Sequence, residues 1–160
     1  KMTNEISHDR LFMLFDTQTM MHCMPLLAPF MNEYETSHPG QKVESIIIEA
    51  TDHFESKYLI NDTCTKLNKP FSIGGVQQYR GQTITCIPGS RTYRDLFPNA
   101  EDNAECHSCA ILGILGVVPG VIGTIQATEA IKYILNLGQL LTNRLLVFDA
   151  RSMSFNVLEF

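Results

Sequence analysis

The segment that most constrains the fold is residues 116–132, GVVPGVIGTIQATEAIK, which has the pattern of a glycine-punctuated entry into a long apolar helix. Apolar residues recur at helical spacing on one broad face; they are Val118, Val121, Ile122, Ile125, Ile131, Ile134 and Leu135. We expect Val121, Ile125 and Ile134 to be buried. Gly120 and Gly123 would let the first turns pack close to another backbone. The pattern therefore predicts a helix held inside a core.

Upstream, residues 45–50 form a short apolar run with β-branched side chains, which predicts a buried strand. Thr51 and Asp52 follow it, and either could cap a helix over residues 54–67. We expect residues 45–50 and 71–76 to be parallel neighbouring strands joined by this helix. An aspartate at the carboxyl end of a strand lies where α/β folds place ligand chemistry. The alternative is that Asp52 is only a helix cap, and the local pattern favours neither.

The rest of the chain supports an α/β fold with a mixed sheet and flanking helices. Residues 82–87 are expected to form a strand that follows a turn containing Gly81, and residues 145–148 and 155–160 an antiparallel pair. Residues 88–105 are polar and predict a loop or crossover. Residues 1–44 are apolar and methionine-rich, with prolines at Pro25 and Pro29. We expect an α/β domain over 45–160 and an unassigned, largely helical segment over 1–44.

Composition limits the classes of function. A chain of 160 residues is long enough for one core. Its net charge of −5 argues against nonspecific nucleic-acid binding, which needs a basic surface. No apolar run approaches the roughly 20 residues that span a bilayer. The five cysteines lack the rhythm of a disulfide scaffold. We therefore expect a cytoplasmic protein that binds neither nucleic acid nor membrane.

Several ordered segments resemble one enzyme family. They are ATDHFESKYLIND at 50–62, KPFSIGGV at 69–76, YRGQTIT at 79–85, YRDLFP at 93–98, a cysteine at Cys106, the glycine-rich helix, and RLLVFDA at 144–150. In this order they resemble the ThiF/MoeB/HesA adenylyltransferases of thiamine and molybdopterin biosynthesis, relatives of the ubiquitin-activating enzymes. The resemblance covers about residues 45–160 and implies the C-terminal half of a Rossmann-like fold.

The resemblance also implies a chemistry. These enzymes use ATP and Mg²⁺ to activate the C-terminal carboxylate of a ubiquitin-like sulfur-carrier protein as an acyl-adenylate. By this resemblance Asp52 would hold the Mg²⁺ of the nucleotide, and Lys57 lies where the family often has an arginine, so both are candidate nucleotide-binding residues. Cys106 falls where some members have a cysteine that bonds covalently to the carrier, and it is the candidate thiol acceptor. A homodimer is expected.

Two departures from the family alter these expectations. The family's glycine-rich phosphate loop precedes the aspartate motif, whereas the first 44 residues here hold a single glycine, Gly40. We therefore expect a fragment or truncated form that alone neither binds ATP tightly nor adenylates a carrier. Most members also hold a structural zinc with two Cys-x-x-Cys pairs. The first pair aligns with Thr92 and Asp95, so we expect no zinc.

Two other functions remain open from the sequence. One is a non-catalytic module that binds the carrier or dimerises. The other is a thiol redox protein that uses Cys106 and Cys109, whose Cys-x-x-Cys spacing is typical of redox or metal sites. Cys64 and Cys86 fall in a predicted helix and strand, and we expect both to lie in the core.

Overall fold

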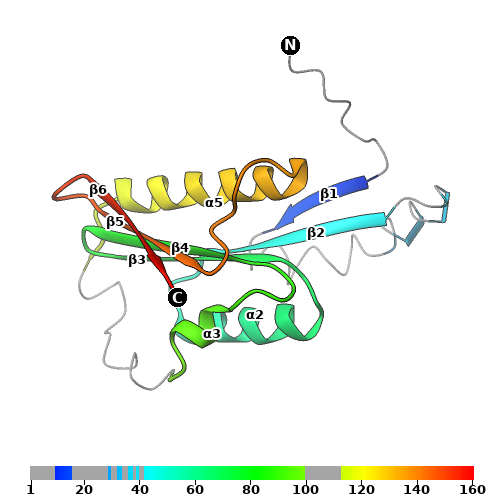
Figure 1. Cartoon of the computed structure of the whole chain (residues 1–160), viewed down its shortest axis with the longest axis horizontal. Helices are drawn as coiled ribbons and strands as arrows, with labels where there is room; N and C mark the ends of the chain where they lie inside the picture. The colour runs from blue at the N-terminus through cyan, green and yellow to red at the C-terminus, as the bar shows by residue number, and fades with distance from the viewer. Residues whose placement is uncertain are drawn as a thin grey trace, which may run out of the picture.

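The computed structural model describes residues 10–15, 29, 32–33, 36–37, 39, 42–99 and 113–160. Within these residues six strands form one sheet in the order β1-β2-β3-β4-β5-β6. Helix α5 lies on one face of the sheet, and helices α2 and α3 lie on the other (Figure 1). The chain therefore forms three layers, which confirms the expected α/β class.

The strands β1, β2 and β3 run parallel to one another, whereas β3 to β6 alternate in direction, so the sheet is mixed as expected. The strands are β1 Arg10–Phe15, β2 Lys42–Glu49, β3 Phe71–Gln77, β4 Arg80–Cys86, β5 Arg144–Asp149 and β6 Ser154–Glu159. The helices are α2 Phe54–Lys66, α3 Tyr93–Leu96 and α5 Val117–Leu135. The predicted antiparallel pair at the end of the sequence is the β5–β6 hairpin.

The predicted strand–helix–strand unit is confirmed. Strands β2 and β3 are parallel neighbours, with Ile47 opposite Phe71, and α2 connects them. The expectation that Thr51 or Asp52 caps the helix is wrong. The N-cap is His53, in an extended conformation and without a side-chain hydrogen bond to the helix. Thr51 is not free for capping because its hydroxyl is bonded to a glutamate at the end of β2.

The expectation of a largely helical segment over residues 1–44 is wrong at β1. Residues 10–15 form a strand whose backbone pairs in parallel with β2, with Leu11 opposite Val43 and Phe15 opposite Ile47. A short apolar run cannot be assigned to helix or strand by periodicity alone. Residues 10–15 form a strand because their backbone pairs with the edge of β2. Residues 29, 32–33 and 36–37 are helical. The sheet therefore begins well before residue 45.

The glycines act differently from expectation. Gly81 lies within β4 rather than in a turn, and the chain reverses at Gln78, whose φ is 50°. A Cβ at Gly81 would collide with Ile122 and lie 3.0 Å from Val118 Cγ1. By contrast, no such neighbour among the described residues lies within 4 Å of a Cβ at Gly120 or Gly123. The close approach of helix to sheet therefore depends on a strand glycine and not on the helix glycines.

The buried stripe of α5 is also displaced from the predicted one. Its buried residues are Val118, Ile122, Gln126, Glu129 and Ala130, whereas Val121, Ile125 and Ile134 are only half-buried. The prediction considered only the apolar residues of the helix, whereas Gln126 and Glu129 are buried as well. These two polar side chains turn inward, so the helix is rotated relative to its apolar pattern.

The core is divided by the sheet. The larger cluster packs beneath α2 and α3; its buried members are Ile47, Tyr58, Ile60, Cys64, Phe71, Ile73, Ile84, Cys86, Tyr93 and Leu145. A smaller cluster of Val118, Ile122 and Phe148 packs beneath α5. The polar stretch expected as a loop contains the short helix α3. In the described part of the chain, no helix has the length and apolar character needed to cross a bilayer.

Candidate functional site

Asp52 follows the carboxyl end of β2, in the short connection to α2, and its side chain is 64% exposed. The His53 ring lies beside it, with Nε2 3.4 Å from Asp52 Oδ1. An exposed carboxylate offers the hard oxygen ligands that Mg²⁺ prefers. Asp52 is thus an exposed carboxylate at the carboxyl end of a strand, and its role as a metal–nucleotide ligand stays a prediction.

A buried ion pair lies directly behind Asp52. Glu49, the last residue of β2, is fully buried, and Lys57 of α2 is 5% exposed. Lys57 Nζ lies 2.6 Å from Glu49 Oε2. It also donates hydrogen bonds to the carbonyl oxygens of Thr51, at 2.8 Å, and Gly74, at 2.5 Å. The three donors of the ammonium are thus all used inside the protein.

The same ion pair holds Thr51. Glu49 Oε1 accepts hydrogen bonds from the Thr51 amide at 2.6 Å and from the Thr51 hydroxyl at 2.5 Å. The Thr51 carbonyl in turn accepts from Lys57. All three polar groups of the residue before Asp52 are therefore bonded to the pair.

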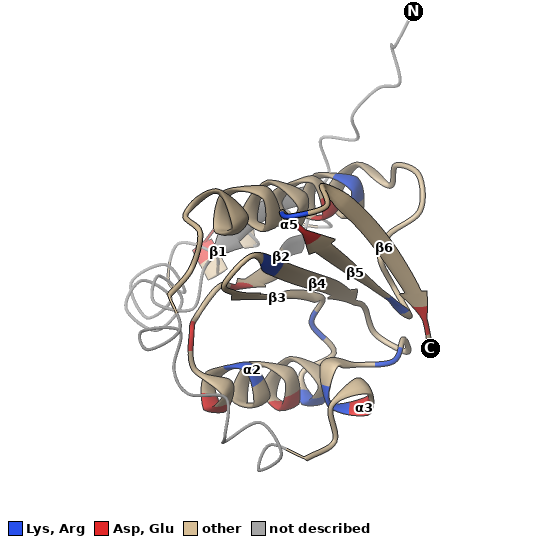
Figure 2. Cartoon of the chain, turned by 90° about the vertical axis from the view of Figure 1, so that its left-hand side faces the viewer, with Lys and Arg blue, Asp and Glu red and all other residues tan. Residues whose placement is uncertain are grey.

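The opposite face of the sheet contributes Gln126 from α5. Its Nε2 donates to the Glu49 carbonyl at 3.0 Å, and it lies 3.4 Å from Ser72 Oγ. Gly74 makes room for this amide, because a Cβ there would lie 2.7 Å from Gln126 Oε1. Figure 2 shows α2 and α5 on opposite faces of the sheet, so the strand end is held from both layers.

The structure gives Lys57 a different orientation from the one that a nucleotide-binding residue would need. Lys57 faces the interior rather than an incoming phosphate, and its direct role in nucleotide binding stays a prediction. Sequence reasoning missed Glu49 and Gln126. The available signal was a polar residue at the end of an apolar strand and another within an apolar helix, because polar side chains in buried segments need partners.

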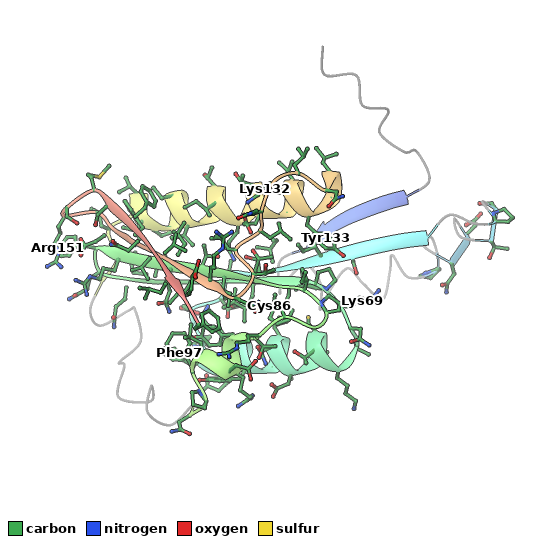
Figure 3. All side chains as sticks on the ribbon, in the orientation of Figure 1. Lys69, Cys86, Phe97, Lys132, Tyr133 and Arg151 are labelled. Atoms are coloured by element: carbon green, nitrogen blue, oxygen red, sulfur yellow. The ribbon has the colours of Figure 1, made fainter. Side chains whose placement is uncertain are left out.

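The candidate thiol acceptor Cys106 lies outside the described residues, as do His107 and Cys109. Cys64 and Cys86 are buried, as expected. Burial raises the pKa of the Cys64 thiol to about 11 and that of the Cys86 thiol to about 12. Figure 3 shows Cys86 between the sheet and α2. Neither thiol is placed to act as a nucleophile, because the reactive form is the thiolate.

Thr92 and Asp95, which align with the first zinc-binding cysteine pair of the family, make a helix cap. The Asp95 carboxylate accepts hydrogen bonds from the Thr92 amide at 2.7 Å and from the Thr92 hydroxyl at 2.9 Å. This interaction closes the N-terminus of α3. The two side chains thus have a structural role that needs no metal, and the absence of zinc stays a prediction.

The fold is similar to that of a solved structure, the crystal structure of E. coli MccB with succinimide. The TM-score is 0.59 at 13% sequence identity, over 94% of this chain and 56% of that one. At this identity the likeness concerns the fold alone. It supports the Rossmann-like arrangement that the sequence motifs implied.

Curated relatives are more similar in sequence. A SAMP-activating enzyme E1 of Haloferax volcanii is 40% identical over 115 residues, which cover 72% of this chain and 43% of the relative. The adenylyltransferase and sulfurtransferase MOCS3-1 of Zea mays is 44% identical over 115 residues, 71% of this chain and 25% of the relative. This chain therefore spans less than half the length of these relatives. The model of the ThiF family matches residues 37–160, and the chain accordingly belongs to the ThiF family.

Proposed function

We propose that this chain forms part of an adenylyltransferase that uses ATP to activate the C-terminal carboxylate of a ubiquitin-like sulfur-carrier protein. The observation that carries the proposal is Asp52, an exposed carboxylate at the carboxyl end of a parallel strand with a fixed backbone behind it. The names of the relatives support the same class, since they include an activating enzyme and adenylyltransferases.

In this reaction the carrier carboxylate attacks the α-phosphorus of ATP. A carboxylate–phosphorus bond forms, the bond to the bridging oxygen breaks, and pyrophosphate leaves. Mg²⁺, when bound, offsets the charge of the phosphates. Asp52 would hold it, because its carboxylate is exposed. Lys57 would act indirectly, through its ion pair with Glu49 and its hydrogen bond to the Thr51 carbonyl.

Further features of the proposal follow from the family resemblance. The Cys106 thiolate would attack the carrier's acyl-adenylate, so that a thioester forms, the acyl–phosphate bond breaks and AMP leaves. The protein would form a homodimer, and no zinc would be bound, since Thr92 and Asp95 cap α3. Residues 1–160 alone are proposed to be inactive, because the glycine-rich phosphate loop of the family does not occur in their sequence.

The direct test is ATP–pyrophosphate exchange by the full gene product with a carrier that ends in Gly-Gly. Asp52→Asn should lower kcat/KM by about 100-fold, because an amide is a poor ligand for the metal. Asp62→Asn is the matched control. Asp62 is also an exposed aspartate, 53% exposed, and it pairs with Arg94 rather than with the site; its replacement should change the exchange rate less than twofold.

Two outcomes would contradict the proposal. Carrier binding without any pyrophosphate exchange would identify a non-catalytic module instead. Calorimetry of residues 1–160 with Mg-ATP tests the second part. A micromolar dissociation constant, about −8 kcal/mol, would show that this chain supplies a phosphate site without the loop.

A further inference from the structure

We propose that Glu49 and Lys57 are positioning residues for Asp52, which they hold in place by clamping the peptide at Thr51. The inference rests on the proposed function, in which Asp52 binds the metal of the nucleotide. It assigns to the buried pair a task other than stabilising the fold, and it makes Thr51 the link between the pair and the surface.

The geometry supports a clamp because Thr51 has no polar group left over. Its amide and hydroxyl both donate to Glu49 Oε1, at 2.6 and 2.5 Å, and its carbonyl accepts from Lys57 Nζ at 2.8 Å. Asp52 is the next residue, and its own side chain is exposed. The clamp therefore restrains the backbone from which the Asp52 side chain extends.

The alternative is that the pair only stabilises the core. A buried ion pair contributes little net stability compared with apolar residues of the same shape, because desolvation offsets the attraction. Apolar side chains at Glu49 and Lys57 would fill the space equally well. They could not bind the three polar groups of Thr51, which would then lack partners. The charged pair is thus explained by what it holds.

The clamp is itself anchored from four elements. Glu49 ends β2, Lys57 comes from α2, the Gly74 carbonyl that Lys57 also binds belongs to β3, and Gln126 of α5 bonds the Glu49 carbonyl at 3.0 Å. With this anchoring, the backbone that carries Asp52 does not need to be ordered when the metal arrives. Preorganisation of this kind lowers the cost of binding.

Thr51→Val is the primary test, because it removes one hydroxyl and keeps the shape of the side chain. Thr85→Val is its matched control. The Thr85 hydroxyl also donates to a buried glutamate, Glu129 Oε2, at 2.9 Å, but Thr85 lies in β4 and does not touch Asp52. Both replacements remove a hydroxyl donor from a buried carboxylate, so both should lower the melting temperature. Only Thr51→Val should affect the metal.

The first readout is the Mg²⁺ dependence of ATP–pyrophosphate exchange by the full gene product. Thr51→Val should raise the Mg²⁺ concentration for half-maximal rate about tenfold, the effect of one hydrogen bond to a charged group. Thr51→Ser should restore the wild-type value, since serine keeps the hydroxyl. The second readout is amide hydrogen exchange of residues 50–54, which should be faster in Thr51→Val and unchanged in Thr85→Val.

The ion pair itself is tested with the double variant Glu49→Leu/Lys57→Met, which removes both the acceptor and the donor of the clamp, because either single change would leave a buried unpaired charge. The double variant should fold and show the same increase in Mg²⁺ requirement as Thr51→Val. Wild-type Mg²⁺ dependence and wild-type amide exchange in both variants would overturn the inference. If the wild-type protein shows no pyrophosphate exchange with any carrier, the proposed function fails, while amide exchange of residues 50–54 still decides whether the clamp exists.

Discussion

The two faces of the sheet are built from different kinds of residue. Along β3, Phe71 and Ile73 point into the apolar cluster beneath α2 and α3, whereas Ser72 and Gly74 face α5. Strand β4 repeats the division, with Ile84 and Cys86 on the α2 side and Thr83 and Thr85 on the α5 side; the Thr85 hydroxyl donates to Glu129 of α5. Because successive side chains of a strand point to opposite faces, one sequence carries both surfaces.

The difference shows that the two helical layers are held by different forces. The α2 side relies on burial of large apolar side chains, which is strong but has little directional preference. The α5 side combines the smaller apolar cluster of Val118, Ile122 and Phe148 with polar side chains that bind one another. Glu129 Oε2 accepts from the Thr85 hydroxyl at 2.9 Å and from the Leu141 amide at 2.5 Å, and Oε1 accepts from Lys132. Such a network is satisfied in one arrangement only, so it fixes the position of the helix.

The largest expected effect concerns the apolar face. Phe71→Ala should lower the free energy of unfolding by about 3–5 kcal/mol, because it empties a site that is 2% exposed and cannot collapse freely. Phe155→Ala is the control on β6, where the ring is 53% exposed, and should cost less than about 1 kcal/mol. Urea denaturation measures both. Equal losses would mean that burial on the α2 side is not the dominant contribution.

The next effect concerns the polar face. Glu129→Ala should lower the free energy of unfolding by about 3 kcal/mol, since the Thr85 hydroxyl and the Leu141 amide lose a buried acceptor. Figure 3 shows Lys132, the third partner, on α5. Glu129→Gln keeps one acceptor oxygen and should recover about half of the loss. A Glu129→Ala protein as stable as the wild type would show that α5 is held by apolar contacts alone.

The buried thiols of the apolar face give a pH dependence. Burial raises the pKa of Cys64 from 9.0 to about 11 and that of Cys86 to about 12. Since the folded state favours the protonated thiols, their contribution to stability is complete below pH 9.0 and is lost as the pH rises toward 11. We expect a loss of about 1 kcal/mol per thiol by pH 10. Replacement of both by alanine should remove this slope.

Thiol labelling at pH 8 provides a second measurement on the same residues. Cys64 and Cys86 should react only as fast as the protein opens, because neither is accessible as a thiolate when folded. The sequence predicts that Cys106 reacts faster, from a polar loop. Protection of Cys106 equal to that of the two buried thiols would remove it as a candidate nucleophile.

The sequence predicted the parts of the fold that depend on local pattern. The β-branched run before Glu49 predicted β2, and the helical spacing after Asp52 predicted α2. Residues 71–76 were expected to form the neighbouring strand, which is β3. The strand β1 was missed because a short apolar run becomes a strand only when a neighbour pairs with it. The rotation of α5 was missed because Gln126 and Glu129 count as polar in any pattern, although both are buried.

The candidate site also has one part that the sequence could indicate and one part that it could not. Asp52 was found because the end of a strand is a place that sequence can identify. The clamp behind it was not, since it joins residues far apart in the chain. Gln126 lies 77 positions from the Glu49 carbonyl that it binds, and Gly74 lies 17 positions from Lys57. Only the packing of α2 and α5 against the sheet brings these groups together.

The last expected effect tests where the sheet and α5 meet, and it has opposite signs at two glycines. Gly81→Ala should lower the free energy of unfolding by about 1–2 kcal/mol, because the new methyl group would collide with Ile122 and lie 3.0 Å from Val118 Cγ1. Gly123→Ala should instead raise it by about 0.5–1 kcal/mol. Gly123 lies inside α5 with open space around it, and alanine is the better helix former. Thermal unfolding of the two variants beside the wild type measures the difference, which should survive in the double variant because the two sites do not touch. A destabilising Gly123→Ala would show that a surface not seen in the described residues packs against that turn of the helix. A neutral Gly81→Ala would show that α5 can move away from β4, and the polar face would then be less restrictive than the network around Glu129 implies.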